Sequence, residues 1–291
     1  MAEADTIYSL LYWLDNHLDL PLKLDNVAAK SGYSKWHLQR MFRYVTGQTL
    51  GAYIRARRLS RSAVALRVSS RSILDIALQY HFDSQQTFTR AFKKQFGITP
   101  AVYRQSADWP SKGLCPPIRM EAATWPQPDF IKLPDMSLMG APQIYHTSLE
   151  HLSRFLHSDL RLYFWQQFLD KVNTVPPFLY GLHRLVAGAA NDIEQDITLH
   201  YTTAVPAKEY ITCMPMAGPV MIEGGDYAQF TYEGAIEGFQ DFIILIYDTA
   251  VPLLGLTRRQ GQDIERFSLG QQVKAFPESI VRCDYLIPIL R

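Results

Sequence analysis

The sequence predicts a multidomain protein in which an all-α region is followed by an α+β region built on an antiparallel sheet. Before residue 106 the apolar residues recur with the 3.6-residue period of helices. After residue 130, runs rich in Tyr, Thr, Val, Ile and Phe alternate with two helical stretches. Six prolines lie between the two regions, within residues 106–134, which is too many for a regular helix.

The composition excludes several classes of protein. With 291 residues, of which 47% are hydrophobic and 20% charged, the chain is neither disordered nor collagen-like. Its three cysteines (Cys115, Cys213 and Cys283) form no C-x-x-C pair, so we expect reduced thiols and no structural zinc. No stretch approaches the ~18 apolar residues of a membrane span, and the acidic start at 1–5 does not resemble a secretory signal. We expect a cytoplasmic protein.

The charge divides the chain at the same place as the periodicity. Residues 1–106 carry 15 Lys and Arg against 7 Asp and Glu, a net charge of +8, and residues 107–291 carry 14 against 21, a net charge of −7. This asymmetry indicates that the first region meets a polyanion and that the second has another task. We predict domains at 1–106 and 125–291, with a linker at 107–124.

The basic region contains an internal repeat with an offset of 50 residues. Segment 34–43 runs parallel to 84–93, and Gly47-x-Thr49-x-x-x-Tyr53 recurs as Gly97-x-Thr99-x-x-x-Tyr103. One residue of slippage upstream aligns Tyr33 with Phe82. Two copies of one small helical unit are the natural interpretation.

Each copy has the pattern of a helix-turn-helix. In the first, a short helix at 24–30 precedes a turn where Gly32 can take positive φ, and Ser34 caps the second helix. Ser84 is the expected cap in the second copy. The second helix of each copy is amphipathic. Its inward stripe is Leu38, Met41, Phe42 and Val45 in the first copy, and Phe88, Ala91, Phe92 and Phe96 in the second.

The outward faces carry side chains that suit DNA. The major groove admits one helix, where arginine can donate two hydrogen bonds to guanine and glutamine can bridge to adenine. The residues expected at base edges are Trp36, Gln39, Arg40, Gln85, Gln86, Thr89 and Arg90. Those expected on phosphates are Lys35, Arg43, Lys93 and Lys94. The alternative is two ordinary solvated faces, with Trp36 partly buried, but the repetition of the same polarity favours DNA reading.

A helix at 52–68 connects the two copies. At ~1.5 Å per residue it spans roughly 25 Å, near the ~34 Å between successive major-groove faces. One chain could therefore straddle two turns on one side of the duplex as a monomer. The arginines of this helix are expected to turn largely outward: Arg55, Arg57, Arg58, Arg61 and Arg67.

The basic region resembles a known family. The residues are Gly32-Tyr33-Ser34-x-x-His37-Leu38-Gln39-Arg40-x-Phe42 and Phe82-x-Ser84-Gln85-x-x-Phe88-x-Arg90-x-Phe92-Lys93. They resemble the AraC/XylS transcription regulators, and within them the Rob branch, related to MarA and SoxS. This resemblance implies activation of multidrug-efflux and stress promoters by recruitment of RNA polymerase. It also implies that the first recognition helix reads most bases, while the second lies on the backbone in some complexes.

Beyond residue 130 the pattern predicts two rounds of strand, helix, strand and strand. The first round has a strand at 130–133 with 137–141, a helix at 148–169, and strands at 178–182, 195–203 and 210–214. The second has a strand at 225–232, a helix at 234–249, and strands at 263–267 and 281–289. This order predicts an antiparallel sheet with helices on one side. Two such halves commonly enclose a cleft.

Residues 107–291 contain no motif of a hydrolase, metalloprotease, P-loop or dinucleotide site, so no catalytic residue, metal or cofactor is predicted. Aromatic residues with a few acids suit a lipophilic cation through Coulomb and cation–π attraction. The candidate effector-binding residues are Glu265, Trp165, Tyr163, Tyr180, Tyr227, Phe230 and Tyr232. Most aromatic residues of this region are nevertheless expected to be ordinary core, and the alternative for Glu265 is a solvated strand carboxylate.

The second region also resembles a family. The segments Gly225-Asp226-Tyr227-Ala228-x-Phe230-x-Tyr232-Glu233-Gly234 and Asp263-Ile264-Glu265-Arg266-Phe267 are similar to GyrI-like effector-binding domains. The resemblance implies that Glu265 faces a hydrophobic cleft and contacts cationic drugs. Phe267 stands where the family motif has tyrosine, so that hydroxyl is missing. Fatty acids, bile salts and dipyridyl are also implied as inducers, which leaves an anionic or neutral effector open.

The sequence thus predicts a transcription activator that binds double-stranded DNA, contacts RNA polymerase and responds to a small lipophilic effector. Two alternatives stay open. The second region could be a small-molecule hydrolase, or the protein could bind DNA without sequence preference as an architectural factor.

Overall fold

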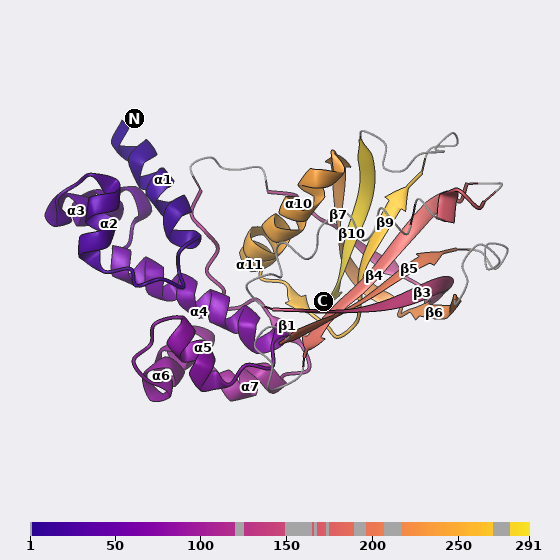
Figure 1. The fold of residues 1–291 in the computed structure, drawn as a ribbon, viewed down its shortest axis with the longest axis horizontal. Helices are drawn as coiled ribbons and strands as arrows, with labels where there is room; N and C mark the ends of the chain where they lie inside the picture. Colours follow the sequence, from indigo (N-terminus) through magenta and orange to yellow (C-terminus); the bar gives the residue numbers. More distant parts are fainter. Residues whose placement is uncertain are drawn as a thin grey trace.

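A helical domain lies beside a sheet domain in the computed structural model (Figure 1). The structure describes residues 2–119, 125–148, 165, 168–172, 175–188, 196–206, 217–269 and 280–291. Helices occupy the part of the chain before residue 106, and antiparallel strands with helices on one side follow. The predicted fold class is confirmed.

Residues 2–105 form seven α-helices with short connections. They are α1 (Ala2–Asp15), α2 (Leu24–Ser31), α3 (Lys35–Thr46), α4 (Leu50–Val68), α5 (Ile73–Gln79), α6 (Gln85–Phe96) and α7 (Pro100–Gln105). Hydroxyl caps start five of them, because Ser34, Thr49, Ser72, Ser84 and Thr99 each accept a backbone N–H three residues on. Gly32, Gly47 and Gly97 end α2, α3 and α6 in the left-handed region.

The long helix α4 carries two separate hydrophobic cores. Its first half contributes Leu50, Tyr53 and Ile54 to a core shared with α1, α2 and α3. Its second half contributes Leu59, Ala63, Ala65 and Leu66 to a core shared with α5, α6 and α7. The two helix-turn-helix units therefore sit on opposite ends of one 19-residue helix.

Part of the segment predicted as a linker is held by both domains. Strand β1 (Trp109–Pro110) pairs antiparallel with β8 (Thr257–Arg258) of the sheet domain. Further along, the backbone N–H of Cys115 donates to the Ser60 hydroxyl at 2.8 Å, so the segment also lies along α4.

The sheet domain is built from antiparallel pairs. Its other strands are β2 (Asp129–Leu133), β3 (Met136–Thr147), β4 (Phe178–Ala187), β5 (Ile197–Val205), β6 (Gly218–Ile222), β7 (Gly225–Gly234), β9 (Asp263–Ser268) and β10 (Val281–Leu290). The described strands follow the order β6-β3-β5-β4-β9-β10-β7-β2, with β8 and β1 beside the end of β10. The turns β2–β3 and β6–β7 meet where the Gly224 N–H donates to Asp135 at 2.7 Å.

The two faces of the sheet form different cores. Residues such as Phe230, Phe267 and Tyr285 pack under the helical segment made of α10 (Phe239–Leu245), the π-helix η3 (Ile246–Ala250) and α11 (Val251–Leu254). Figure 1 shows α10 and α11 beside β7 and β10. The opposite face contributes Leu182, Ile264 and Leu286 to a second core. Alternation along each strand therefore sends neighbouring residues to separate cores.

Several predicted element boundaries need correction. The helix predicted at 234–249 begins as a short 3₁₀ turn at Ile236–Gly238, because Gly234 still belongs to β7 and pairs with Val281. It ends at Leu254, beyond the predicted residue, and a π turn precedes Pro252, which has no N–H to donate. The strand predicted at 210–214 and most of the helix at 148–169 lie outside the described residues.

Candidate functional site

The exposed face of α3 is formed by the polar residues of the first helix-turn-helix. Leu38, Met41 and Phe42 are buried against the core, which turns the opposite side outward. The residues on that side are Lys35, Trp36, Gln39, Arg40 and Arg43, and all of them are exposed. The alternative of a partly buried Trp36 is wrong, because its exposed fraction is 68%.

Two of these side chains, Trp36 and Arg40, contact each other. The Arg40 guanidinium carbon lies 4.8 Å from the centroid of the Trp36 ring, a cation–π contact between residues one helical turn apart. Tyr44, a further turn along α3, is 84% exposed and was not among the predicted residues. Its spacing of four residues from Arg40 could have identified it.

Helix α6 presents a similar face in the second unit. Phe88, Phe92 and Phe96 are buried, and the Ser84 cap fixes the start of the helix. Gln85, Gln86, Arg90, Lys93 and Lys94 are exposed, whereas Thr89 is partly buried. In Figure 1, α3 and α6 both lie on the side of the helical domain away from the sheet.

The arginines of α4 do not extend this basic face as predicted. Arg57 is 2% exposed, and its Nε atom donates to Asp15 at 2.7 Å. Arg58 and Arg67 donate to backbone carbonyls, and Arg61 pairs with Asp248 at 3.3 Å. Of the five arginines, only Arg55 is exposed. The position of Arg57 one turn after the buried Tyr53 was the available signal.

Glu265 lies in the middle of the sheet domain. Strand β9 places it on the face that α10 covers, in line with Phe267, and its exposed fraction is 0%. The Tyr201 hydroxyl donates to its carboxyl group at 2.8 Å, and His183 Nε2 lies 3.6 Å from it. The alternative of a solvated strand carboxylate is therefore wrong.

The predicted aromatic residues are divided between the two faces. Trp165 and Phe230 belong to the core under α10, on the same side as Glu265, and Tyr232 packs against that core. Tyr180 and Tyr227 belong to the core of the opposite face. Tyr163 lies outside the described residues. Period-two alternation accounts for this division, since Tyr227 is an odd number of residues from Phe230.

A second buried carboxylate, Asp263, lies two residues before Glu265 on the same face and was not predicted. Arg258 pairs with it at 2.8 Å, and the hydroxyls of Tyr247 and Tyr285 both donate to it. Burial by itself would raise the pKa of Asp263, but these partners and the nearby His183 lower it by more, so its pKa lies below the ordinary value. Alternation along β9 could have found Asp263, but not its partners.

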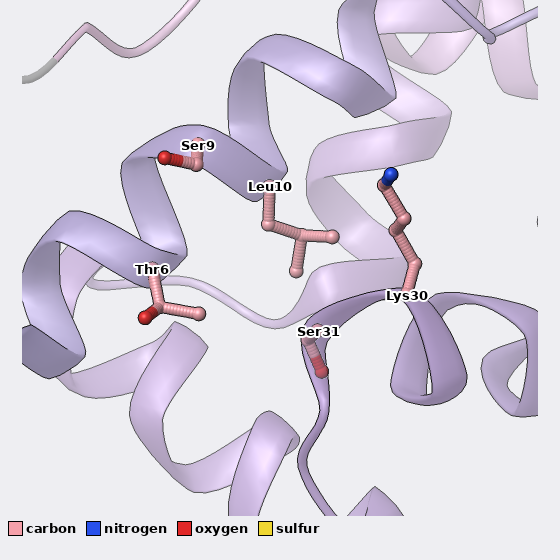
Figure 2. Close-up of a pocket in the computed structure, with 5 residues that line it drawn as sticks. All are labelled: Thr6, Ser9, Leu10, Lys30 and Ser31. Atoms are coloured by element: carbon pink, nitrogen blue, oxygen red, sulfur yellow. The ribbon is translucent and has the colours of Figure 1, made fainter.

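A small recess lies elsewhere, between α1 and α2. It has a volume of about 100 Å³ and is lined by Thr6, Ser9, Leu10, Lys30 and Ser31. Figure 2 shows these side chains on the two helices. None of them was predicted as a site residue. All of them belong to the helical domain, whereas Glu265 belongs to the sheet domain.

The described residues contain no group of three or more His, Cys, Asp or Glu side chains placed to hold a metal ion. Among the described helices, none combines the length and the apolar character that crossing a bilayer requires.

Each of the two regions matches a known protein family. A model of a helix-turn-helix domain matches residues 27–106, and a model of the GyrI-like small molecule binding domain matches residues 126–290. The chain is 54% identical to the transcriptional regulator Rob of Salmonella typhimurium and to the right origin-binding protein of Escherichia coli K12, with 100% of each chain covered. The regulatory protein SoxS of Escherichia coli K12 is 57% identical over 36% of this chain and 97% of SoxS.

These matches bear on the hydrolase alternative that the sequence left open. The relatives matched over their full length include a transcriptional regulator, so the chain is a regulator rather than a hydrolase. The chain belongs to the Rob family of AraC-type transcription regulators, with an N-terminal helix-turn-helix region and a C-terminal GyrI-like small-molecule-binding domain.

Proposed function

We propose that this regulator is an intracellular activator that binds promoter DNA as a monomer and reads it with α3 and α6. Its GyrI-like domain takes a small lipophilic effector, and the bound protein contacts RNA polymerase at stress and multidrug-efflux promoters. The division into residues 1–106, a linker at 107–124 and residues 125–291 belongs to this proposal.

The observation that carries the proposal is the pair of exposed recognition faces at the two ends of α4. Trp36, Gln39 and Arg40 on α3 and Gln85, Gln86 and Arg90 on α6 are exposed in the free protein. The 19 residues of α4 correspond to roughly 28 Å at ~1.5 Å per residue. This length is close to the ~34 Å that separates successive major-groove faces of one duplex.

Within α3, Arg40 is the strongest candidate for a base contact. Its stacking on Trp36 restrains the guanidinium before DNA is present, so less side-chain entropy is lost on binding. Lys35 is paired with Asp25, which leaves Arg43 as the freer phosphate contact on this helix. On α6, Thr89 would approach DNA with part of its side chain already in contact with the protein.

Site selection from a random DNA library, followed by fluorescence anisotropy, tests the reading by α3. Arg40→Ala should lower the affinity for the selected site by about 1–3 kcal/mol, with the loss confined to one base-pair position. Arg55→Ala, which removes an exposed arginine of α4, is the matched control and should retain the sequence preference. A uniform loss on all sequences in Arg40→Ala would instead support architectural, non-specific binding.

The effector part of the proposal is based on Glu265 and the aromatic core around it. The carboxyl group lies among Tyr201, His183 and the core that contains Phe230 and Trp165. Because Glu265 is fully buried, contact with a ligand requires this core to open. Binding therefore selects a state with different packing, as a ligand-responsive domain requires. Tyr232 borders the same core, whereas Tyr180 and Tyr227 could act on the effector only from the opposite face.

Thermal unfolding with two probes tests this part. A tetraphenylphosphonium salt represents lipophilic cations, and decanoate represents lipophilic anions. The cation should stabilise the full chain by about 2.7 kcal/mol at a hundredfold excess over its Kd, and Glu265→Gln should remove most of that gain. Glu233→Gln, at an exposed acid of β7, is the control. Stabilisation by decanoate that Glu265→Gln leaves intact would contradict a cation-binding role.

The polymerase contact and the activating role have a separate test. Purified protein with RNA polymerase should raise transcription from a template that carries the selected site. Addition of protein that lowers transcription, or leaves it unchanged on every template, would contradict activation while leaving DNA binding in place.

A further inference from the structure

The two helix-turn-helix units meet at the middle of α4. The core of the first unit ends on α4 at Ile54, and the core of the second begins at Leu59. Among the described residues, no buried side chain belongs to both cores. The direction of α3 relative to α6 therefore depends on α4 and on the contacts that cross this junction.

One set of such contacts forms a clasp on the loop between α1 and α2. Arg58 Nε donates to the carbonyl oxygen of Leu18 at 2.9 Å, and Arg58 Nη2 donates to that of Leu20 at 2.7 Å. The carbonyl between them, that of Asp19, lies 2.7 Å from His81 Nε2. Because a carbonyl oxygen only accepts, Nε2 is the donor in this contact.

The clasp joins the two units, because its acceptor carbonyls belong to the first unit and one of its donors belongs to the second. Arg58 belongs to the junction in α4, whereas His81 lies in the turn of the second helix-turn-helix, 62 residues from Asp19. Three successive carbonyls of the first unit are thus held by the shared helix and by the second unit. Segment 113–118 also crosses the junction, since Leu114 packs on the second core and Ile118 on the first.

The backbone at His81 indicates why this residue is unusual. Its φ is +59°, the left-handed region in which side chains other than glycine are disfavoured. The equivalent residue of the first unit is Gly32, with φ of +72°. The two turns are closed by the same type of backbone hydrogen bond. The N–H of Gly32 donates to the carbonyl of Ala29, and the N–H of His81 donates to the carbonyl of Leu78, in each case three residues earlier. Glycine would serve this turn without strain, so the histidine is explained by its contact with Asp19.

We propose that His81 is a positioning residue that fixes the relative direction of the two recognition helices, and through it the spacing of the DNA segments that the regulator accepts. The inference rests on the proposed reading of DNA by both α3 and α6. Because the bond is exposed, water can replace it, so its loss should affect orientation more than folding stability.

The test uses full-length protein and the DNA site selected from a random library. A second duplex carries one base pair inserted between the two contacted segments, which rotates one against the other by about 34°. The wild-type protein should lose about tenfold or more in affinity on insertion. His81→Gly should bind the original site about three- to tenfold more weakly and lose less than about threefold on insertion. Its melting temperature should match or exceed that of the wild type.

Gly32→Ala is the matched control. It places a Cβ atom at the equivalent turn of the first unit, where nothing lies within 4 Å of it, and leaves the clasp in place. It should lower the melting temperature and retain the wild-type sensitivity to insertion. If His81→Gly matches the wild type in affinity and insertion penalty, or if the wild type tolerates insertion, the inference is overturned. Failure of the wild type to select any sequence would instead refute the proposed DNA reading.

Discussion

Arginine has three different tasks within the helical domain, although the residue type is the same. Arg40 is exposed over Trp36 and is available to DNA. Arg58 and Arg67 are partly buried and donate to carbonyl oxygens at the ends of helices and loops. Arg57 is buried in an ion pair with Asp15. The net charge of +8 therefore overstates the charge that DNA meets, because several of these cations serve the fold.

Asp15 is the anionic partner of the buried Arg57. Asp15→Asn leaves the Arg57 guanidinium buried without its anionic partner, so it should lower the free energy of unfolding by about 3–5 kcal/mol. Asp25→Asn breaks the pair with Lys35, in which both side chains are more than half exposed, and should cost less than about 1 kcal/mol. Urea unfolding measures both. Equal losses would show that the pair of Arg57 and Asp15 is not a buried structural contact.

At the scale of elements, one carboxylate joins four segments of the sheet domain. Asp263 on β9 accepts from Tyr247 on η3, from Arg258 on β8 and from Tyr285 on β10. Tyr247 in turn stacks on Trp109 of β1, with ring centroids 6.4 Å apart. The segment that follows the helical domain is thereby attached to the same cluster that lies beside Glu265.

The cluster around Asp263 should make the stability of the fold depend on pH. The partners of Asp263 lower its pKa in the fold, so its contribution to stability is present above its ordinary pKa of 3.8 and is lost as the pH falls below that value. Urea unfolding should show a decline in stability between about pH 5 and pH 2. Asp263→Asn should cost about 3–5 kcal/mol at pH 7 and flatten this decline.

Asp241→Asn, at an exposed carboxylate of α10, is the control for that experiment and should keep the wild-type pH profile. An Asp263→Asn protein whose stability declines as steeply as that of the wild type would mean that other carboxylates produce the acid sensitivity.

At the scale of the whole molecule, two ion pairs among the described residues connect the domains. Arg71, after α4, pairs with Asp196 before β5, and both side chains are at least nine-tenths buried. Arg61 on α4 pairs with Asp248 on η3 at 3.3 Å, in a more exposed position. The backbone N–H of Ser70 also donates to the carbonyl of Asp196 at 3.1 Å. These contacts place the GyrI-like domain against the helix that carries both units.

The two ion pairs differ in burial, so we expect them to differ in their contribution to stability. Asp196→Asn should lower the free energy of unfolding by about 3–5 kcal/mol, because Arg71 stays buried, whereas Asp248→Asn should cost at most about 1 kcal/mol. Calorimetry of the full chain should also show separate transitions for the two domains in Asp196→Asn. A single transition at the wild-type temperature would contradict a role of this pair in domain coupling.

The sequence by itself determined the helix-turn-helix repeat, its caps and the faces of α3 and α6. These features follow from periodicity, hydroxyl caps and turn glycines, which act between residues close in the chain. The same local reasoning placed most strands of the sheet domain. It also selected Glu265 as a candidate, although the resemblance to GyrI-like domains was needed to single it out.

Only the tertiary structure decided which charged residues are buried together and which aromatic residues share a face. Arg57 finds Asp15 42 residues away, and Asp263 finds Tyr285 22 residues away. His81 reaches Asp19 across the junction of two units. Local patterns do not encode these pairings, because a buried charge is stable only beside a partner that the packing of separate elements brings to it.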